Sequence, residues 1–154
     1  MTAPLFSRIH HVCIVVGNLD QARSYYESLG ITGWYDYPKG VPYEEYEVPN
    51  PQGSAKLKYA CVDLENIQLQ LCEPGVEDTP QRRFLDEYGE GVYHLGFEVP
   101  ELRAALEAAD GLGLPRIAYG IRGDDSGFCY FDTRKEAGTV LEIRVTAPAS
   151  QAIS

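Results

Sequence analysis

The sequence predicts an α+β fold built from two βαβββ modules, and two observations carry this prediction. The first is an internal repeat, because residues 11–31, HVCIVVGNLDQARSYYESLGI, align without a gap to residues 94–114, HLGFEVPELRAALEAADGLGL. Six of the 21 positions are identical, where average composition gives roughly one or two matches. The identical pairs are His11/His94, Val16/Val99, Leu19/Leu102, Ala22/Ala105, Leu29/Leu112 and Gly30/Gly113. The second observation is that each copy reads as a strand and a helix, followed by three strand-like runs.

The first module, about residues 8–74, begins with the strand that contains His11. Asn18 can cap the following helix, with Gln21 three residues on, and Gly30 suits the left-handed position after its last turn. Strand-like runs follow over residues 32–37, 56–63 and 67–72. The polar stretch 37–56 is expected to be a loop that is long enough to cover a site.

A connecting helix is predicted over residues 79–88, with Thr79 as its cap and Pro80 as its first residue. The second module, about residues 91–146, repeats the pattern, and its helix ends at Gly113 because Pro115 blocks continuation. Its later strand-like runs cover residues 116–120, 127–131 and 139–145. Residues 147–154 are expected to be a frayed tail, and the whole chain 1–154 is expected to be a single domain.

Composition excludes some partners and favours a location. Lys and Arg total 13 against 23 for Asp and Glu, a net charge of −10, which argues against nucleic acid or an anionic membrane as a partner. The first residues lack a charged leader followed by an apolar run, so we expect a soluble, cytoplasmic protein. The four cysteines show no C-x-x-C spacing and are expected to be reduced and structural.

Alternation along the strands divides their side chains between two faces. One face is apolar and can pack under the helices, as with Val12, Ile14 and Val16. The opposite face carries four ligand-type residues: His11, Gln70, His94 and Glu142. His and Glu are ligands of first-row metals, and Gln can ligate through its carbonyl oxygen, so the pattern predicts a mixed nitrogen and oxygen metal site.

Ordinary structural roles compete with this interpretation. A single histidine on a strand is more often solvated or hydrogen-bonded than a ligand, but matched placement of two histidines favours the site. Glu98 and Arg144 either line the same pocket or form an ordinary salt bridge. His10 falls on the opposite face, where it packs or faces solvent.

The motifs IHHVCIVVGNLDQARSYY, IQLQLCEP, FLDEYGEGVYHLGFEV and GTVLEIRV carry a family resemblance. Over about residues 8–146 the chain resembles the vicinal oxygen chelate superfamily, which includes glyoxalase I, extradiol dioxygenases and bleomycin resistance proteins, and within it methylmalonyl-CoA epimerase. The resemblance implies a curved, partly open, barrel-like sheet around a metal-binding cavity, with helices outside. It also implies a homodimer and one divalent ion of Co, Mn, Ni, Zn or Fe, held by His11, Gln70, His94 and Glu142.

The function implied is that of an isomerase that removes a proton next to a metal-chelated carbonyl, with Glu142 as ligand or released base. The substrate would be a small molecule with two adjacent oxygens. A glyoxalase I-like lyase, an Fe(II) extradiol dioxygenase and a non-catalytic, ligand-sequestering protein remain alternatives. Several aromatic residues, Phe128 and Tyr130 among them, would suit a flat or apolar ligand.

One position departs from the epimerase pattern. Where those enzymes have a second carboxylate on a loop of the first module, this chain has Asn50 and Pro51. Glu44, Glu45 or Glu47 would have to substitute for it.

Overall fold

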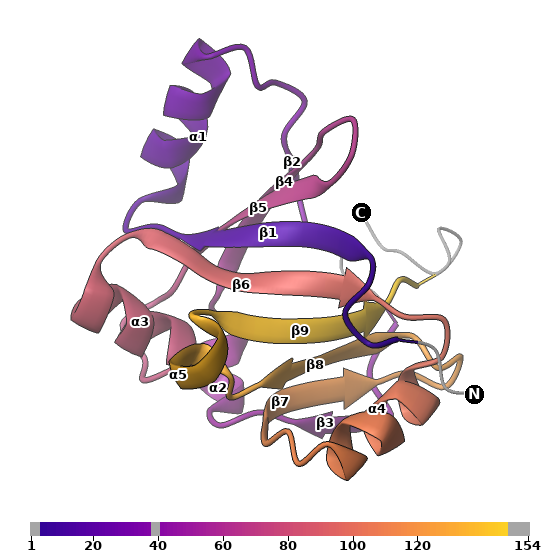
Figure 1. The fold of residues 1–154 in the computed structure, drawn as a ribbon. Helices are drawn as coiled ribbons and strands as arrows, with labels where there is room; N and C mark the ends of the chain where they lie inside the picture. The colour runs from indigo at the N-terminus through magenta and orange to yellow at the C-terminus, as the bar shows by residue number, and fades with distance from the viewer. Residues whose placement is uncertain (1–3, 38–40, 148–154) are drawn as a thin grey trace. The chain divides into compact units, whose positions relative to one another are not determined.

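The computed structural model describes residues 4–37 and 41–147, in which nine strands and five helices follow each other in a mixed order (Figure 1). The α+β class and the two βαβββ modules are confirmed. The chain divides into two compact units. Among the described residues, unit 1 holds 4–10, 41–48 and 94–147, and unit 2 holds 11–37 and 49–93.

Unit 2 contains most of the first module. Its strands are most of β1 (Ile9–Val15), β2 (Tyr35–Asp36), β4 (Lys58–Asp63) and β5 (Gln68–Glu73), in the order β2-β4-β5-β1. β1 runs parallel to β5, and the other neighbours are antiparallel. Its helices are α1 (Leu19–Ser28), α2 (Pro51–Ser54) and α3 (Pro80–Tyr88).

The helix signals in unit 2 act as expected. The Asn18 side chain accepts a hydrogen bond from the Gln21 amide at 2.9 Å, and Gly30 adopts a φ of 92° just after α1. Thr79 caps α3 in the same way, by accepting from the Arg82 amide at 3.1 Å. Apolar residues of α1 pack on Val12, Ile14, Leu69 and Leu71, which is the face predicted to lie under the helix.

Unit 1 contains the second module and one strand from the first. Its strands are most of β6 (Gly91–Glu98), β7 (Arg116–Ile121), β8 (Gly127–Phe131), β9 (Val140–Val145) and β3 (Glu45–Glu47), in the order β6-β9-β8-β7-β3. β6 runs parallel to β9, as β1 does to β5. α4 (Leu102–Gly111) covers one face, packing Leu102, Leu106 and Ala109 on Cys129, Phe131 and Ile143. α5 (Arg134–Ala137), which the sequence did not predict, joins β8 to β9.

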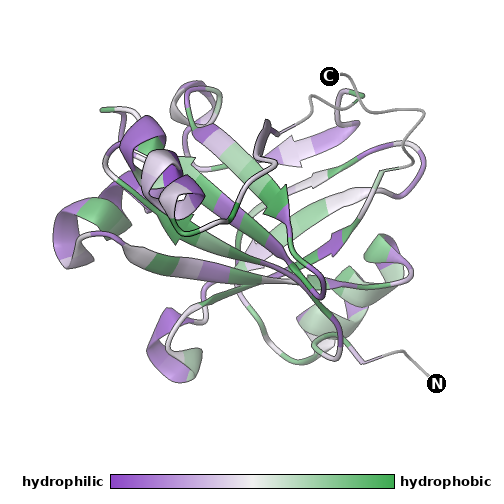
Figure 2. Ribbon diagram, turned by 90° about the horizontal axis from the view of Figure 1, so that it is seen from above, coloured by the Kyte–Doolittle hydropathy of each residue, from purple (hydrophilic) through white to green (hydrophobic). Residues whose placement is uncertain are grey.

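Hydrophobic and polar residues alternate along many of the strands (Figure 2). One face of each set of strands therefore packs under a helix and the other carries the polar residues. Cys13, Cys61, Cys72 and Cys129 are all buried and reduced, as predicted. In the part of the chain that the structure describes, no helix combines the length and hydropathy needed to cross a membrane.

The prediction of a continuous loop over residues 37–56 is wrong. Glu45–Glu47 form β3, which pairs antiparallel with the edge of β7, and Arg122 holds the preceding turn by donating from Nε to the Val41 carbonyl at 2.7 Å. Further on, Asn50 caps α2 and Pro51 is its first residue. These elements are too short to show hydrophobic periodicity. They also depend on contacts with distant segments, which a local sequence pattern does not record.

Most of the expected tail, residues 148–154, lies outside the described residues. Thr146, at the end of β9, is held by Glu98, which accepts from its amide at 2.8 Å and from its hydroxyl at 2.6 Å.

Candidate functional site

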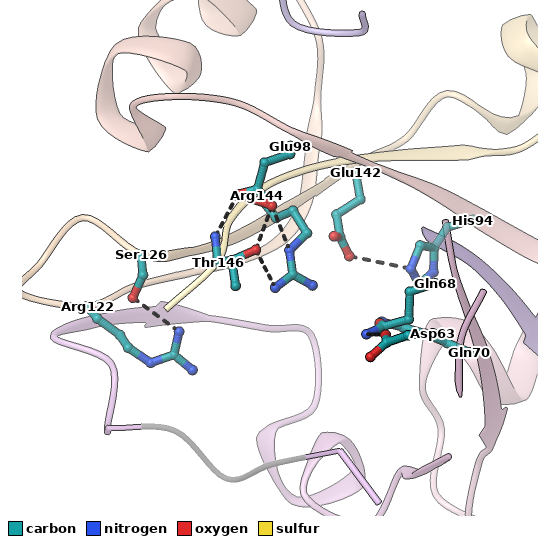
Figure 3. A network of polar contacts seen from close by, with 10 residues as sticks. All are labelled: Asp63, Gln68, Gln70, His94, Glu98, Arg122, Ser126, Glu142, Arg144 and Thr146. Carbon is teal, nitrogen blue, oxygen red and sulfur yellow. Dashed lines mark hydrogen bonds and ion pairs between the residues drawn. The ribbon is translucent and has the colours of Figure 1, made fainter. Parts of the chain in front are cut away.

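Two of the four predicted ligand residues lie side by side in unit 1. β6 and β9 are parallel neighbours, and Glu142 pairs in register with Gly96, two residues from His94 on the same face. His94 Nε2 lies 3.4 Å from Glu142 Oε2 (Figure 3), and the two residues are 0% and 3% exposed. A buried imidazole and a buried carboxyl group are therefore held together on the face opposite α4.

Burial controls the charge state of this pair. Desolvation lowers the pKa of His94 to about 3, and the nearby Arg144 acts in the same direction. Desolvation also raises the pKa of Glu142 to about 7, although Arg144 and a hydrogen bond with Tyr130 oppose the shift. The imidazole is thus neutral at pH 7, so the 3.4 Å contact is not an ion pair, and neutral imidazole is the form that binds metals.

Tyr130 contacts both members of the pair, and this contact was not predicted from the sequence. It lies opposite Glu142 in the pairing of β8 with β9, and its side chain hydrogen-bonds to Glu142. Its ring meets the His94 ring edge-to-face, with centroids 4.8 Å apart. The signal was present in the strand GFCYF, where Cys129 and Phe131 are buried under α4 and Tyr130 therefore faces the other way.

A row of aromatic rings continues from Tyr130 toward the edge strand. Ring centroids are 5.3 Å apart for Tyr130 and Phe128, 5.5 Å for Phe128 and Tyr43, and 5.3 Å for Tyr43 and Tyr46. Gly120 makes room for the row, since a Cβ there would lie 2.8 Å from the Tyr43 ring. Phe128 and Tyr130 are only partly buried, so this face of unit 1 offers an aromatic wall beside His94.

Glu98 and Arg144 form the ordinary ion pair that was one of the two expectations for them. Arg144 Nε lies 3.5 Å from Glu98 Oε1, and the Arg144 guanidinium also donates to the Thr146 hydroxyl at 3.3 Å (Figure 3). Arg144 is 9% exposed, so this buried cation is the main charge that acts on His94 and Glu142.

The other two predicted ligand residues lie on one face of unit 2. In the parallel pairing of β1 with β5, His11 is opposite Gln68, and Gln70 follows two residues later on the same face. His11 is 1% exposed and Gln70 is 3% exposed. Each module therefore carries a buried histidine on its first strand and, on the parallel neighbour of that strand, a buried side chain with an oxygen that could ligate a metal.

Asn50 and two of the three glutamates that could replace the second carboxylate, Glu45 and Glu47, have other partners. Asn50 Oδ1 accepts from the Gly53 amide at 3.2 Å, and its Nδ2 donates to the Asp78 carbonyl at 3.0 Å. Glu45 pairs with Arg103 at 2.8 Å, and Glu47 hydrogen-bonds to Tyr119. Asn50 thus has a structural role at the start of α2.

The paired modules define an α+β protein in which His11, Gln70, His94 and Glu142 are buried on the helix-free faces of the strands. The family model of the Glyoxalase/Bleomycin resistance protein/Dioxygenase superfamily matches residues 10–131. The chain belongs to this superfamily.

Several known proteins are similar to this chain. The structure of methylmalonyl-CoA epimerase from Mycobacterium tuberculosis superposes with a TM-score of 0.68 at 24% identity, over 96% of this chain and 93% of that one. A variant of the Streptomyces coelicolor epimerase, in complex with 2-nitronate-propionyl-CoA, gives a TM-score of 0.68 at 22% identity, over 92% of this chain and 99% of that one. The uncharacterized protein YqjC of Bacillus subtilis is 28% identical over 66% of this chain, and the match spans 64% of its own length. The structural likenesses show a shared fold.

Proposed function

We propose that His11, Gln70, His94 and Glu142 hold one divalent metal ion and that the protein is an epimerase-like isomerase. The observation that carries the proposal is the buried pair of His94 and Glu142, a neutral imidazole nitrogen and a carboxylate oxygen 3.4 Å apart. His11, His94 and Glu142 each offer one ligand atom, and Gln70 offers a fourth from the equivalent strand pair of the first module.

The donor set fits an ion of Co, Mn, Ni, Zn or Fe. Two imidazole nitrogens, an amide oxygen and a carboxylate suit a first-row divalent ion and leave octahedral positions open. Such an ion would polarise two adjacent substrate oxygens and stabilise the negative charge of an enolate. This set is the one that the family resemblance implies.

Glu142 is the residue proposed to move the proton. It is a carboxylate among the four ligands, and Tyr130 hydrogen-bonds to it from β8. Glu45 and Glu47 are bonded to Arg103 and Tyr119, and Asn50 cannot act as a base. A small-molecule substrate with an acidic C–H beside a chelating carbonyl, as in an acyl thioester, suits this arrangement.

The aromatic wall favours a second candidate, an Fe(II) dioxygenase acting on a flat ring with two adjacent hydroxyl groups. Phe128 and Tyr130 start this wall directly beside His94. Two histidines and one carboxylate also suit Fe(II) and oxygen chemistry. Oxygen consumption with a catechol would distinguish this reaction from proton exchange.

The first experiment is elemental analysis of protein purified without chelator. We expect near-stoichiometric metal in the wild type and its loss in His11→Ala and His94→Ala, because each substitution removes a ligand. His10→Ala is the matched control, since it removes the neighbouring imidazole and should keep the metal. No metal in the wild type after incubation with divalent ions would refute the site and favour a ligand-sequestering protein.

Activity is then tested by solvent deuterium exchange into methylmalonyl-CoA with the metal-loaded protein. Exchange that Glu142→Gln abolishes would support the isomerase. A metal-loaded protein that exchanges no deuterium and consumes no oxygen would leave a glyoxalase-like reaction to be tested on hemithioacetals. A homodimer in the cytoplasm remains a prediction, and sedimentation would test the dimer.

A further inference from the structure

A polar network on one face of unit 2 leads from an exposed carboxylate to Gln70 (Figure 3). Gln68 Nε2 donates to Asp63 Oδ1 at 3.1 Å and to the Tyr35 hydroxyl at 2.8 Å, and this hydroxyl donates to Asp63 Oδ1 at 3.0 Å. At its other end Gln68 Oε1 accepts from Gln70 Nε2 at 2.6 Å. The network therefore connects Asp63 to Gln70 through a single amide side chain.

The register of the strands explains why these residues meet. Asp63 pairs directly with Gln68 across the antiparallel strands β4 and β5, and Gln70 follows Gln68 by two residues on the same face. Tyr35 on β2 pairs with Cys61, two residues before Asp63, so it too lies on this face. Burial and the neighbouring Asp63 raise the pKa of Tyr35, which keeps its hydroxyl protonated as a donor.

The network has only one consistent direction. A carboxylate can only accept hydrogen bonds, so Gln68 must turn its NH₂ group toward Asp63 and its oxygen toward Gln70. Gln70 must then turn its own NH₂ group toward Gln68. Reversing either amide would bring two acceptor oxygens to 3.1 Å or 2.6 Å, which is repulsive. The charge on Asp63 thus fixes the direction of the Gln70 amide.

We propose that Asp63, acting through Gln68, is a positioning residue that makes the carbonyl oxygen of Gln70 the atom presented to a metal ion. This inference rests on the metal site of the proposed function. Only the oxygen of a neutral amide has a lone pair suited to a divalent ion, so a reversed Gln70 would not ligate. Donation from the Gln70 NH₂ group also polarises its carbonyl and strengthens it as a ligand.

The test is the affinity for Co(II), measured by competition with a chromophoric chelator. We expect Asp63→Asn to weaken binding about tenfold or more, because the amide introduced at position 63 can donate or accept and no longer fixes the direction of the network. The visible absorption of bound Co(II) should change as well, since the ligand at Gln70 is lost or replaced by water. Glu65→Gln is the matched control, because it removes the same charge two residues further on, in the turn between β4 and β5, and should leave both readouts unchanged.

Moving the carboxylate from position 63 to position 68 should restore Co(II) binding. In the double variant Asp63→Asn with Gln68→Glu, the carboxylate now at position 68 can accept both from the amide at position 63 and from Gln70, so the Gln70 amide is again forced to donate. We expect Co(II) affinity and absorption to return toward the wild type. In a Gln70→Ala background, Asp63→Asn should have no further effect, because the proposed path runs through Gln70.

The outcomes separate this inference from the proposed function. A wild type that binds no Co(II) overturns the metal site itself. A wild type that binds Co(II) no more tightly than Asp63→Asn overturns the inference and leaves the site intact. The inference is also overturned if Asp63→Asn weakens Co(II) binding and the added Gln68→Glu does not restore it. The same holds if Asp63→Asn still weakens Co(II) binding in the Gln70→Ala background, because Asp63 would then act by another route.

Discussion

Glu142 is the residue at which the proposed function conflicts most with stability. A carboxylate that is 3% exposed has lost its hydration, and this desolvation is the main cause that raises its pKa to about 7. The ordinary pKa is 4.5, so the unfolded chain ionises Glu142 at a lower pH than the folded chain does. In the metal-free protein this residue must therefore lower the stability of the fold above pH 4.5.

This cost predicts that Glu142→Gln stabilises the metal-free protein in a pH-dependent way. The folded-state pKa is raised, so the penalty is absent below pH 4.5, grows as pH rises toward 7 and is constant above. A shift of this size corresponds to a penalty on the order of 3 kcal/mol at about pH 8. We expect the free energy of unfolding of the variant to exceed that of the wild type by up to this amount at about pH 8 and by little at pH 4.5.

Urea denaturation of both proteins in the presence of chelator measures the difference. Exposed Glu136→Gln serves as the control, because its carboxylate stays hydrated. A difference between Glu142→Gln and the wild type that does not change from pH 4.5 to about pH 8 would contradict the assigned burial cost.

At the scale of elements, α4 is capped by a residue from elsewhere in the chain. Glu101, the residue at the N-cap position, makes no side-chain cap bond. Instead Asp125, in the turn between β7 and β8, accepts from the amides of Leu102 at 2.8 Å and Arg103 at 3.1 Å. Asp125 does this with a φ of 68°, a conformation that Asp and Asn tolerate better than most residues.

Asp125→Ala should therefore cost about 1–2 kcal/mol for the lost cap, with a further cost for Ala at positive φ. Asp125→Asn should cost less, because it keeps one acceptor and tolerates this backbone. Glu101→Ala is the matched control and should be nearly neutral. Urea midpoints rank the three variants, and a Glu101→Ala loss as large as that of Asp125→Ala would show that the cap has been misassigned.

The same helix shows what could be predicted from sequence and what could not. Its existence followed from the repeat and local spacing, as did the placement of His94 and Glu142 on the helix-free face. The helix ends at Gly111, two residues before the predicted Gly113, which takes the left-handed position just after it with a φ of 74°. The Asp125 cap, the pairing of β3 with β7 and the contact of Tyr130 with His94 join residues that are distant in sequence. No periodicity records such contacts, because they depend on strand order and register.

At the scale of the whole molecule, the proposed ligands extend from residue 11 to residue 142, so an ion bound by all four would depend on the folding of both modules. The unfolded chain cannot hold these residues together, so binding should stabilise the fold by mass action. With free Co(II) at about 100 times its dissociation constant, the gain is about 2.7 kcal/mol. For a chain of 154 residues this corresponds to an increase in melting temperature of roughly 5–10 °C.

Calorimetry of chelator-treated protein near neutral pH, with and without Co(II), measures this increase in melting temperature. His11→Ala removes a ligand from the first module and His94→Ala removes one from the second, so each should abolish most of the shift, while His10→Ala should retain it. If only His94→Ala abolished the shift, the ion would be held by the second module alone. An equal shift in all four proteins would mean that Co(II) binds outside the proposed site.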